Sequence, residues 1–163
     1  LLQGDEPLTL PRHLELFVQA ITESPESDAW NATGPIEHED ELDRHSFVKC
    51  TVSQSNRILY CFRRSPCYCD FNLQKTFIRK ILGMIAFRKD FLLRLTELPA
   101  SVVEQAEFIE QMRIIESGHT LRSIPVSPSL PSVNEPTESD VVLEYIERDP
   151  EQAALLERIL QKG

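Results

Sequence analysis

The sequence lacks several features that mark particular classes of protein. It has no long apolar run, and no basic segment followed by an apolar stretch and a cleavage site. A membrane protein and a secreted protein are therefore not expected, and the cytoplasm is the expected location. No internal repeat is present. With 163 residues, 41% of them hydrophobic, the chain is long enough to bury one sizeable core.

Positive charge is also scarce in the chain as a whole. It has 17 Lys and Arg against 26 Asp and Glu, a formal net charge of −9. Because binding to nucleic-acid phosphate needs a surface rich in Lys and Arg, general nucleic-acid binding is not expected. The segment from Arg44 to Arg94, however, holds eleven Lys or Arg and only two acidic residues, Asp70 and Asp90. This segment is either a solvated basic face or a surface that faces an anionic small molecule.

The four cysteines do not have the spacing of a zinc site. Cys50 and Cys61 lie in apolar runs that resemble strands, and a single residue separates Cys67 from Cys69. Structural zinc usually requires paired cysteine knuckles, or cysteine and histidine at regular spacing. Buried, reduced thiols that act as small apolar residues are therefore expected.

The first residues form an informative short segment. Gly4 allows a ligand to approach the backbone, Asp5 offers hard oxygen ligands to a cation, and Pro7 fixes the exit of the chain. Leu1 and Leu2 are expected to be the last apolar residues of a buried strand. From these residues alone, the segment is either a solvated turn or a ligand-binding junction between a strand and a loop.

Apolar periodicity and capping signals predict alternating helices and strands. Helices are expected at 11–22, 90–98, 101–117, 136–146 and 150–160, and strands at 30–36, 47–52, 57–62, 81–87 and 120–126. The acidic run 37–43 is expected to be solvated, and 66–75 to be irregular. The polar tetrapeptide 53–56 predicts a hairpin between its two flanking strands. This order of elements predicts an α/β domain with a mixed sheet and an inserted antiparallel hairpin.

Five segments occur in an order and at a spacing that are more specific than any one of them. They are Gln-Gly-Asp-Glu-Pro-Leu at 3–8, Phe-Val-Lys at 47–49, Leu-Tyr-Cys-Phe-Arg-Arg-Ser-Pro at 59–66, Phe-Arg-Lys-Asp-Phe-Leu-Leu at 87–93 and Glu-Gln-Ala-Glu-Phe-Ile-Glu-Gln-Met-Arg at 104–113. In this order they resemble cytidylyltransferases of the CMP-sugar synthetase type, and most of all the 3-deoxy-manno-octulosonate cytidylyltransferase branch. The resemblance covers 1–148 and implies a Rossmann-like nucleotidyltransferase domain, with 149–163 as a helical extension.

The resemblance implies magnesium-dependent transfer of CMP from CTP to an acidic sugar, with release of pyrophosphate. Asp5 matches the family's Mg²⁺ carboxylate, and Gln3 and Gly4 lie on the nucleotide side of the same loop. Glu110 and Gln111 match positions that face the sugar. From the residues alone, Gln3 would equally make a buried structural hydrogen bond, and Glu110 and Gln111 would decorate a solvated helix face.

The resemblance also implies roles for basic residues. Arg64 matches a catalytic arginine of the family's Ser-Arg-Ser-Pro element, although Arg63 fits a register shifted by one residue. Lys80 is a candidate sugar contact, with Arg79 and Arg88 as further candidate anion contacts. Family members pair through the hairpin, so a homodimer that uses 58–62 is expected.

Two departures from the family bear on activity. The glycine-rich, basic loop that wraps the CTP phosphates should precede Leu1, so the chain is expected to be an N-terminally incomplete fragment that does not catalyse alone. Where the family usually has Gly-Val-Asp-Thr-Pro, with a second metal-binding Asp, this chain has Ser-Val-Asn-Glu-Pro at 132–136. Asn134 offers Mg²⁺ a carbonyl oxygen without charge, so weaker metal binding is expected unless Glu135 compensates.

A third departure bears on the acceptor. The octulosonate branch has a Lys-His and aromatic pattern where this chain has Lys80-Ile81 and, further on, Met84 to Phe87. The loss of a polar contact favours another acidic sugar, or a smaller phosphonate or carboxylate, over octulosonate itself. From the residues alone, Ile81 is a core residue. Two classes of function remain: a CTP-dependent enzyme that activates an acidic sugar, and a noncatalytic homologue or interaction module that retains the fold.

Overall fold

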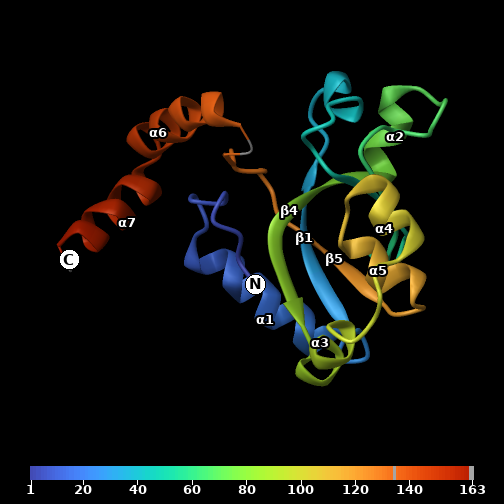
Figure 1. The fold of residues 1–163 in the computed structure, drawn as a ribbon. Helices are drawn as coiled ribbons and strands as arrows, with labels where there is room; N and C mark the ends of the chain where they lie inside the picture. Colours follow the sequence, from blue (N-terminus) through green and yellow to red (C-terminus); the bar gives the residue numbers. More distant parts are fainter. Residues whose placement is uncertain (134, 162–163) are drawn as a thin grey trace.

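The computed structural model describes residues 1–133 and 135–161. Its elements, in chain order, are α1 (Pro11–Glu23), β1 (Ala29–Pro35), η1 (Glu39–Leu42), β2 (Lys49–Val52), β3 (Ile58–Phe62), α2 (Phe71–Phe77), β4 (Ile78–Phe87), α3 (Lys89–Leu95), α4 (Val102–Glu107), α5 (Gln111–Glu116), β5 (Leu121–Pro125), η2 (Pro136–Glu138), α6 (Ser139–Arg148) and α7 (Pro150–Leu160). The strands form one five-stranded sheet in the order β3-β2-β4-β1-β5 (Figure 1). Only the β1–β5 pair is parallel among the described strands, so the mixed α/β sheet that was predicted is confirmed.

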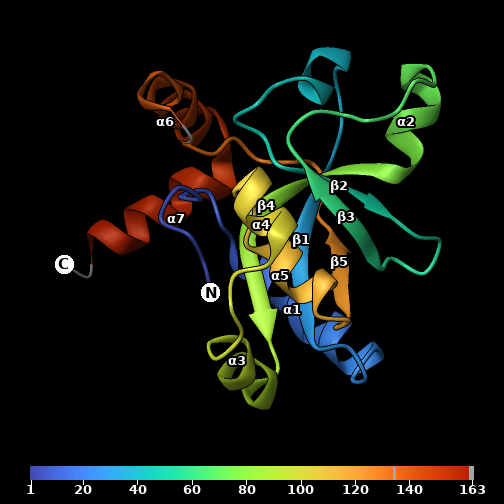
Figure 2. The ribbon, with the colours of Figure 1, turned by 45° about the vertical axis from the view of Figure 1, so that its right-hand side comes forward.

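Helices cover both faces of the sheet because β1 and β4 are apolar on both sides (Figures 1 and 2). Trp30 and Ala32 pack with Phe17 of α1 on one face. Ala29 packs on the other face with Phe91 of α3 and with residues of α5. Successive side chains of a strand point to opposite faces, so a strand buried on both sides must be apolar almost throughout.

The hairpin is present as predicted, with β2 and β3 antiparallel and the turn at 53–56. Asn56 adopts a left-handed conformation with φ of +59°, which asparagine tolerates better than most residues. Its carbonyl accepts a 2.7 Å hydrogen bond from Ser123 N of β5. The tip of the hairpin is thereby tied to the far edge of the sheet.

The structure corrects three predictions of local structure. Leu1 and Leu2 are 72% and 49% exposed. Leu1 exchanges two backbone hydrogen bonds with Ile85 and Leu2 forms an isolated bridge with Met84, but the two residues are not part of a buried strand. The region 66–75, expected to be irregular, contains most of α2, whose N-terminus is capped by the Asp70 carboxylate. The acidic run 37–43 forms η1 and buries Glu41.

The helix predicted from the Ser101 capping box to Gly118 is divided into α4 and α5. Phe108 interrupts it with φ of +56° and ψ of +46°, a left-handed conformation that is uncommon for an aromatic residue. The capping box itself is present, and Gly118 follows the end of α5 with φ of +81°. Both ends of the prediction are confirmed, and its middle is wrong.

The cysteines are all free. Cys50 and Cys61 lie opposite each other on β2 and β3 and are fully buried, as predicted. Burial raises the pKa of the Cys50 thiol to about 12 and raises that of Cys61 well above its usual range. Cys67 and Cys69 differ from the prediction, because both are half-exposed in the loop before α2.

The C-terminal helices α6 and α7 extend beside the N-terminal loop (Figures 1 and 2). Asp149 caps α7 by accepting hydrogen bonds from Glu151 N and Gln152 N, as its sequence before Pro150 indicates. The buried Gln152 side chain donates a 2.7 Å hydrogen bond to the Leu8 carbonyl. Within 1–133 and 135–161, no helix has the length and apolar character needed to span a bilayer.

Candidate functional site

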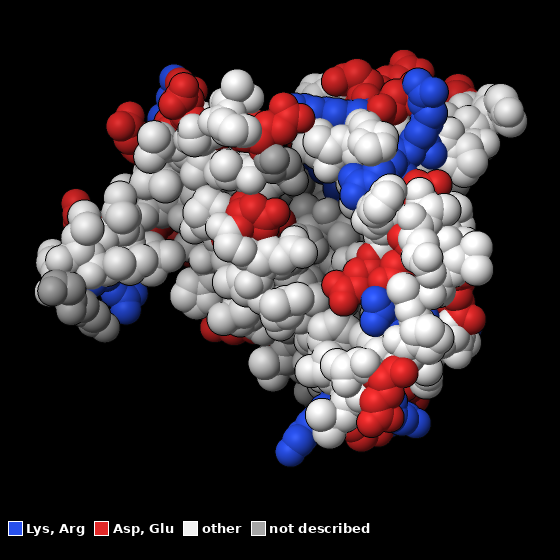
Figure 3. All heavy atoms as spheres, in the orientation of Figure 1, with Lys and Arg blue, Asp and Glu red and all other residues white. Residues whose placement is uncertain are grey.

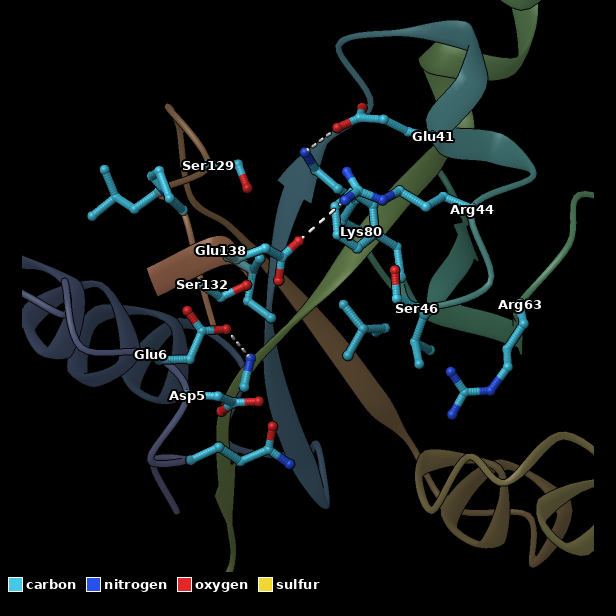
Figure 4. A pocket seen from close by; sticks show the side chains of 18 of the residues that line it. Asp5, Glu6, Glu41, Arg44, Ser46, Arg63, Lys80, Ser129, Ser132 and Glu138 are labelled. Carbon is cyan, nitrogen blue, oxygen red and sulfur yellow. Dashed lines mark hydrogen bonds and ion pairs between the residues drawn. The ribbon is translucent and has the colours of Figure 1, made fainter. Parts of the chain in front are cut away.

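A cavity of about 600 Å³ lies where six segments meet. Its walls come from the N-terminal loop, the segment from η1 to β2, the end of β3, the middle of β4, the turn between α4 and α5, and a last group formed by 129–132, Glu138 and Val141. Gln3, Asp5, Lys80, Glu110 and Gln111, all predicted as site residues, line it together. Three charged segments far apart in sequence therefore meet in one place (Figure 4).

The N-terminal loop approaches the sheet closely at Gly83. Gln3 N donates a 2.8 Å hydrogen bond to Gly83 O, and Gly83 N donates one of 2.7 Å to the Glu6 carboxylate. A Cβ at position 83 would lie 2.7 Å from Gln3 Oε1, so only glycine permits this contact. β4 departs from regular pairing here, since the register between β1 and β4 shifts after Asn31.

Asp5 has a carboxylate oxygen that is suited to a cation. Its Oδ1 is buried and has no hydrogen-bond partner among the described residues. Its backbone is fixed, because Val133 N donates a 2.9 Å hydrogen bond to the Asp5 carbonyl. A buried, unpaired carboxylate oxygen is unfavourable unless a ligand satisfies it. Mg²⁺ prefers such hard oxygen ligands, so the residue fits the metal that the resemblance implies.

Glu6, beside Asp5, is held in a different environment. Burial raises the pKa of Glu6, the hydrogen bond from Gly83 N opposes this rise, and the charge of Asp5 adds to it. The Glu6 carboxylate thus serves the backbone of β4, whereas Asp5 is left for a ligand. Within the described part of the chain, no three His, Cys, Asp or Glu side chains gather as a complete metal-binding group.

Two cations, Lys80 and Arg44, line the cavity on the side away from Asp5 (Figure 4). Lys80 Nζ lies 2.8 Å from Glu41 Oε1, and both side chains are about 10% exposed, at 11% and 10%. Burial alone would raise the pKa of Glu41, but the hydrogen bond from Lys80 and those from the backbone of 37 and 38 lower it instead. Arg44 contacts Glu138 at 3.2 Å and stacks over the Phe47 ring, 4.5 Å from its centroid.

The structure places Arg63, and not Arg64, on the cavity wall. Arg64 is 80% exposed and pairs with Asp43 outside the cavity, so the register with Arg63 is the one that brings an arginine to this wall. The Arg63 guanidinium donates to three backbone carbonyls, those of His45, Glu107 and Phe108, at 3.0, 2.9 and 3.2 Å. It joins the segment before β2 to the turn between α4 and α5, and so acts on the cavity by holding its walls.

The turn after Phe108 presents Glu110 and Gln111 to the cavity. Gln111 Nε2 donates a 3.1 Å hydrogen bond to Asn31 Oδ1. Asn31 is fully buried and in turn donates to the carbonyl of Leu82, at the irregular position of β4. This chain of contacts fixes the Gln111 amide in orientation.

The other predicted positions that the structure describes lie outside the cavity. Gly4 does not line it, and a Cβ added there would meet no atom within 4 Å. Asn134 lies outside the described residues. The Arg79 guanidinium donates hydrogen bonds to the backbone carbonyls of Lys75, Thr76 and Ile78. Arg88 pairs with Asp90.

Sequence reasoning missed several residues of the cavity, namely Glu41, Arg44, Phe47 and Glu138, and also Asn31, which contacts Gln111 from the buried side. Phe47 belongs to one of the segments that carry the resemblance, and Glu41 belongs to the acidic run that was assigned to solvent. Neither has a local pattern that reveals its partner.

On the face shown in Figure 3, Lys and Arg gather at the end of the molecule that carries α2, beside acidic side chains.

Comparisons with known proteins found a matching family and similar sequences. A family model described as cytidylyltransferase matches residues 1–124. The chain is 35% identical over 135 residues to the 3-deoxy-manno-octulosonate cytidylyltransferase of Escherichia coli, covering 83% of this chain and 54% of the relative. It is 31% identical over 150 residues to that of Chlorobium limicola (strain DSM 245 / NBRC 103803 / 6330), with 90% and 60% covered.

A solved structure is similar as well. It is that of CMP:2-keto-3-deoxy-manno-octonic acid synthetase complexed with CTP, with a TM-score of 0.79 and 32% identity. The match covers 90% of this chain and 60% of that one, so the chain spans well under two thirds of the length of the relatives it matches. The shared sheet, the ordered segments and the family model together show that this chain belongs to the cytidylyltransferase family.

Proposed function

We propose that this chain forms the metal- and acceptor-binding part of an enzyme that transfers CMP from CTP to an acidic sugar of the 3-deoxy-manno-octulosonate type, with release of pyrophosphate. The observation that carries the proposal is the cavity in which the unpaired Asp5 oxygen lies with Gln3, Lys80, Glu110 and Gln111. Nucleotidyl transfer depends mainly on positioning and on neutralising charge, which these groups supply. The relatives named above have the same activity in their names.

Each group has a role that its contacts support. Asp5 would hold Mg²⁺, with Asn134 as a weaker second ligand, and the bound ion would neutralise the charge on the reacting phosphate. Gln111, oriented by Asn31, would hydrogen-bond an acceptor hydroxyl, and Glu110 another. Lys80, fixed by Glu41, would offset the acceptor's negative charge. CTP is a cytosolic nucleotide, and the cytoplasm is therefore the proposed location.

The test measures pyrophosphate release from CTP by the full-length protein, with a panel of acidic sugars, phosphonates and carboxylates. Asp5→Asn is expected to lower kcat/KM at least about 100-fold, because it removes the charge that holds the metal. Asp140→Asn, the same change at an exposed position outside the cavity, is the matched control and is expected to leave the rate unchanged. Release that survives Asp5→Asn would reject the metal role.

A noncatalytic homologue is the second candidate, and Asn134 at the position of a second metal-binding Asp favours it. In that case CTP and the acid would bind without turnover. Asn134→Asp is expected to lower the Mg²⁺ concentration needed for half-maximal rate, and an unchanged Mg²⁺ dependence would reject a role for this position. Ile81 lines the cavity next to Lys80, at the place where the octulosonate branch has a polar contact. The identity of the acceptor therefore has to be tested with the panel of acids.

The proposed dimer uses the hairpin. Leu59 and Tyr60 of the edge strand β3 are 49% and 36% exposed, and an edge strand with apolar side chains is suited to pairing. Light scattering of the wild-type protein and of Leu59→Glu would test this pairing, since a charge at the interface should yield monomers.

A further inference from the structure

Two ion pairs lie beside one aromatic ring in the cavity. Lys80 Nζ is 5.6 Å from the centroid of Phe47, and the Arg44 guanidinium is 4.5 Å from it. Each cation has its own carboxylate, Glu41 for Lys80 and Glu138 for Arg44. Figure 4 shows both pairs in the upper part of the cavity, away from Asp5. The cavity therefore has one end that carries both ion pairs and another that carries the metal carboxylate.

The three cations of the cavity differ in how firmly they are engaged. Arg63 is occupied by three backbone carbonyls. Lys80 and Glu41 form a short, nearly buried pair, and Glu41 is fixed further by two backbone N–H groups. Arg44 has one side-chain acceptor among the described residues, Glu138, at the longer distance of 3.2 Å, and remains 44% exposed. Arg44 is therefore the cation whose donors a ligand can reach.

The contact with the Glu138 carboxylate shows what kind of group Arg44 binds. A planar guanidinium presents paired N–H donors that match a carboxylate, and stacking on Phe47 holds its plane. Glu138 comes from η2, 94 residues away in sequence, and meets Arg44 across the cavity. A ligand carboxylate at the same place would form the same contacts and would replace that of Glu138.

We infer that Arg44 binds the carboxylate of the acidic acceptor, and that the Glu138 carboxylate occupies this position until the acceptor arrives. The inference rests on the proposed function, because it assigns the acceptor to the end of the cavity that carries the two ion pairs. Arg44 is then the residue that selects an acid over a neutral sugar. The phosphates of CTP are assigned to the other end, beside the metal at Asp5.

The test is direct binding by calorimetry, with the full-length protein, of 3-deoxy-manno-octulosonate and of its C1 amide, which lacks the negative charge. Arg44→Gln should weaken binding of the acid roughly 10- to 100-fold and leave binding of the amide unchanged, because it removes a charged hydrogen bond. Arg44→Lys should recover part of this affinity, since it keeps the charge without the planar fork. Glu138→Gln should act in the opposite direction and tighten binding of the acid.

The matched control is Arg148→Gln, which removes an Arg–Glu pair on α6 outside this cavity and should change neither affinity. The inference is overturned if the wild type does not bind the acid, if Arg44→Gln weakens acid and amide equally, or if it weakens CTP instead. The proposed function fails separately. Arg44-dependent preference for the acid without any pyrophosphate release would reject the transfer reaction alone, whereas release with an Arg44-independent KM for the acid would reject the inference alone.

Discussion

Gly83 determines how closely the loop that carries Asp5 approaches the sheet. A Cβ at this position would lie 2.7 Å from Gln3 Oε1 and 2.8 Å from Glu6 Cγ. Gly83→Ala must therefore displace the loop, and it is expected to lower the free energy of unfolding by about 1–3 kcal/mol and to weaken Mg²⁺ binding. Gly4→Ala is the control in urea denaturation, because a Cβ there meets no atom within 4 Å. Equal stability of the two variants would contradict this account.

Lys49 gives the fold a dependence on alkaline pH. Its side chain is fully buried on β2, and Nζ donates a 2.8 Å hydrogen bond to Arg44 O. Burial lowers the pKa of Lys49 from 10.5 to about 8. Between these values the unfolded chain holds a proton that the folded chain has lost, so the contribution of Lys49 to the free energy of unfolding rises with pH.

The prediction is made for the difference in unfolding free energy between the wild type and Lys49→Met. This difference is expected to rise by on the order of 2–3 kcal/mol as the pH increases through this window. Taking the difference removes the effects of Cys50 and Cys61, which both variants share. A difference that stays flat in denaturation measurements at successive pH values would show that Lys49 is not desolvated.

At the scale of secondary-structure elements, the junction of α4 and α5 depends on one strained residue. Phe108 is 81% exposed and left-handed, so its ring contributes little to the core while its backbone conformation is unfavourable. Phe108→Gly is expected to be more stable than Phe108→Ala by about 1 kcal/mol, because both lose the ring and only glycine tolerates this conformation. Thermal denaturation of the pair measures the difference, and a more stable alanine variant would contradict it.

Much of the element order could be predicted from local sequence. Strand periodicity and the polar turn predict the hairpin, and Asp149-Pro150 predicts the start of α7. The break at Phe108 could not be predicted, since no local signal marks it and the hydrogen bond to the Phe108 carbonyl comes from Arg63, which belongs to a distant part of the chain. The Asp70 cap of α2 was a usable local signal for the start of that helix.

Some residues of the site, too, could be predicted from local sequence, and others could not. Gln3, Asp5 and Gln111 could be predicted because they lie in segments with a recognisable order. Arg44 and Glu138 could not, since their pairing joins residues 94 apart and neither lies in a motif. Charged residues on a surface carry no information about their partners until the fold brings them together.

At the scale of the whole molecule, α7 stabilises the N-terminal loop through one buried hydrogen bond. Gln152 is 4% exposed and donates to Leu8 O, and Arg12 and Glu151 form an ion pair beside it. Gln152→Ala would leave the Leu8 carbonyl unsatisfied and is expected to lower the free energy of unfolding by roughly 1–3 kcal/mol.

The matched control for Gln152→Ala is Gln105→Ala. The Gln105 side chain also donates to a backbone carbonyl, that of Ala100, but at an exposed position. Its removal should change stability by less than about 0.5 kcal/mol in the same denaturation experiment. Similar losses in both variants would show that α7 does not support the loop.

The hydrogen bond from Gln152 to Leu8 joins residues 144 apart in sequence. It therefore couples local unfolding of α7 to that of the N-terminal loop. Local unfolding of α7 would expose the Leu8 carbonyl and loosen the loop that holds Asp5. By thermodynamic reciprocity, a cation that orders this loop would also slow the fraying of the last helix. Cation binding at the N-terminal loop would then be measurable as slower amide exchange in α7.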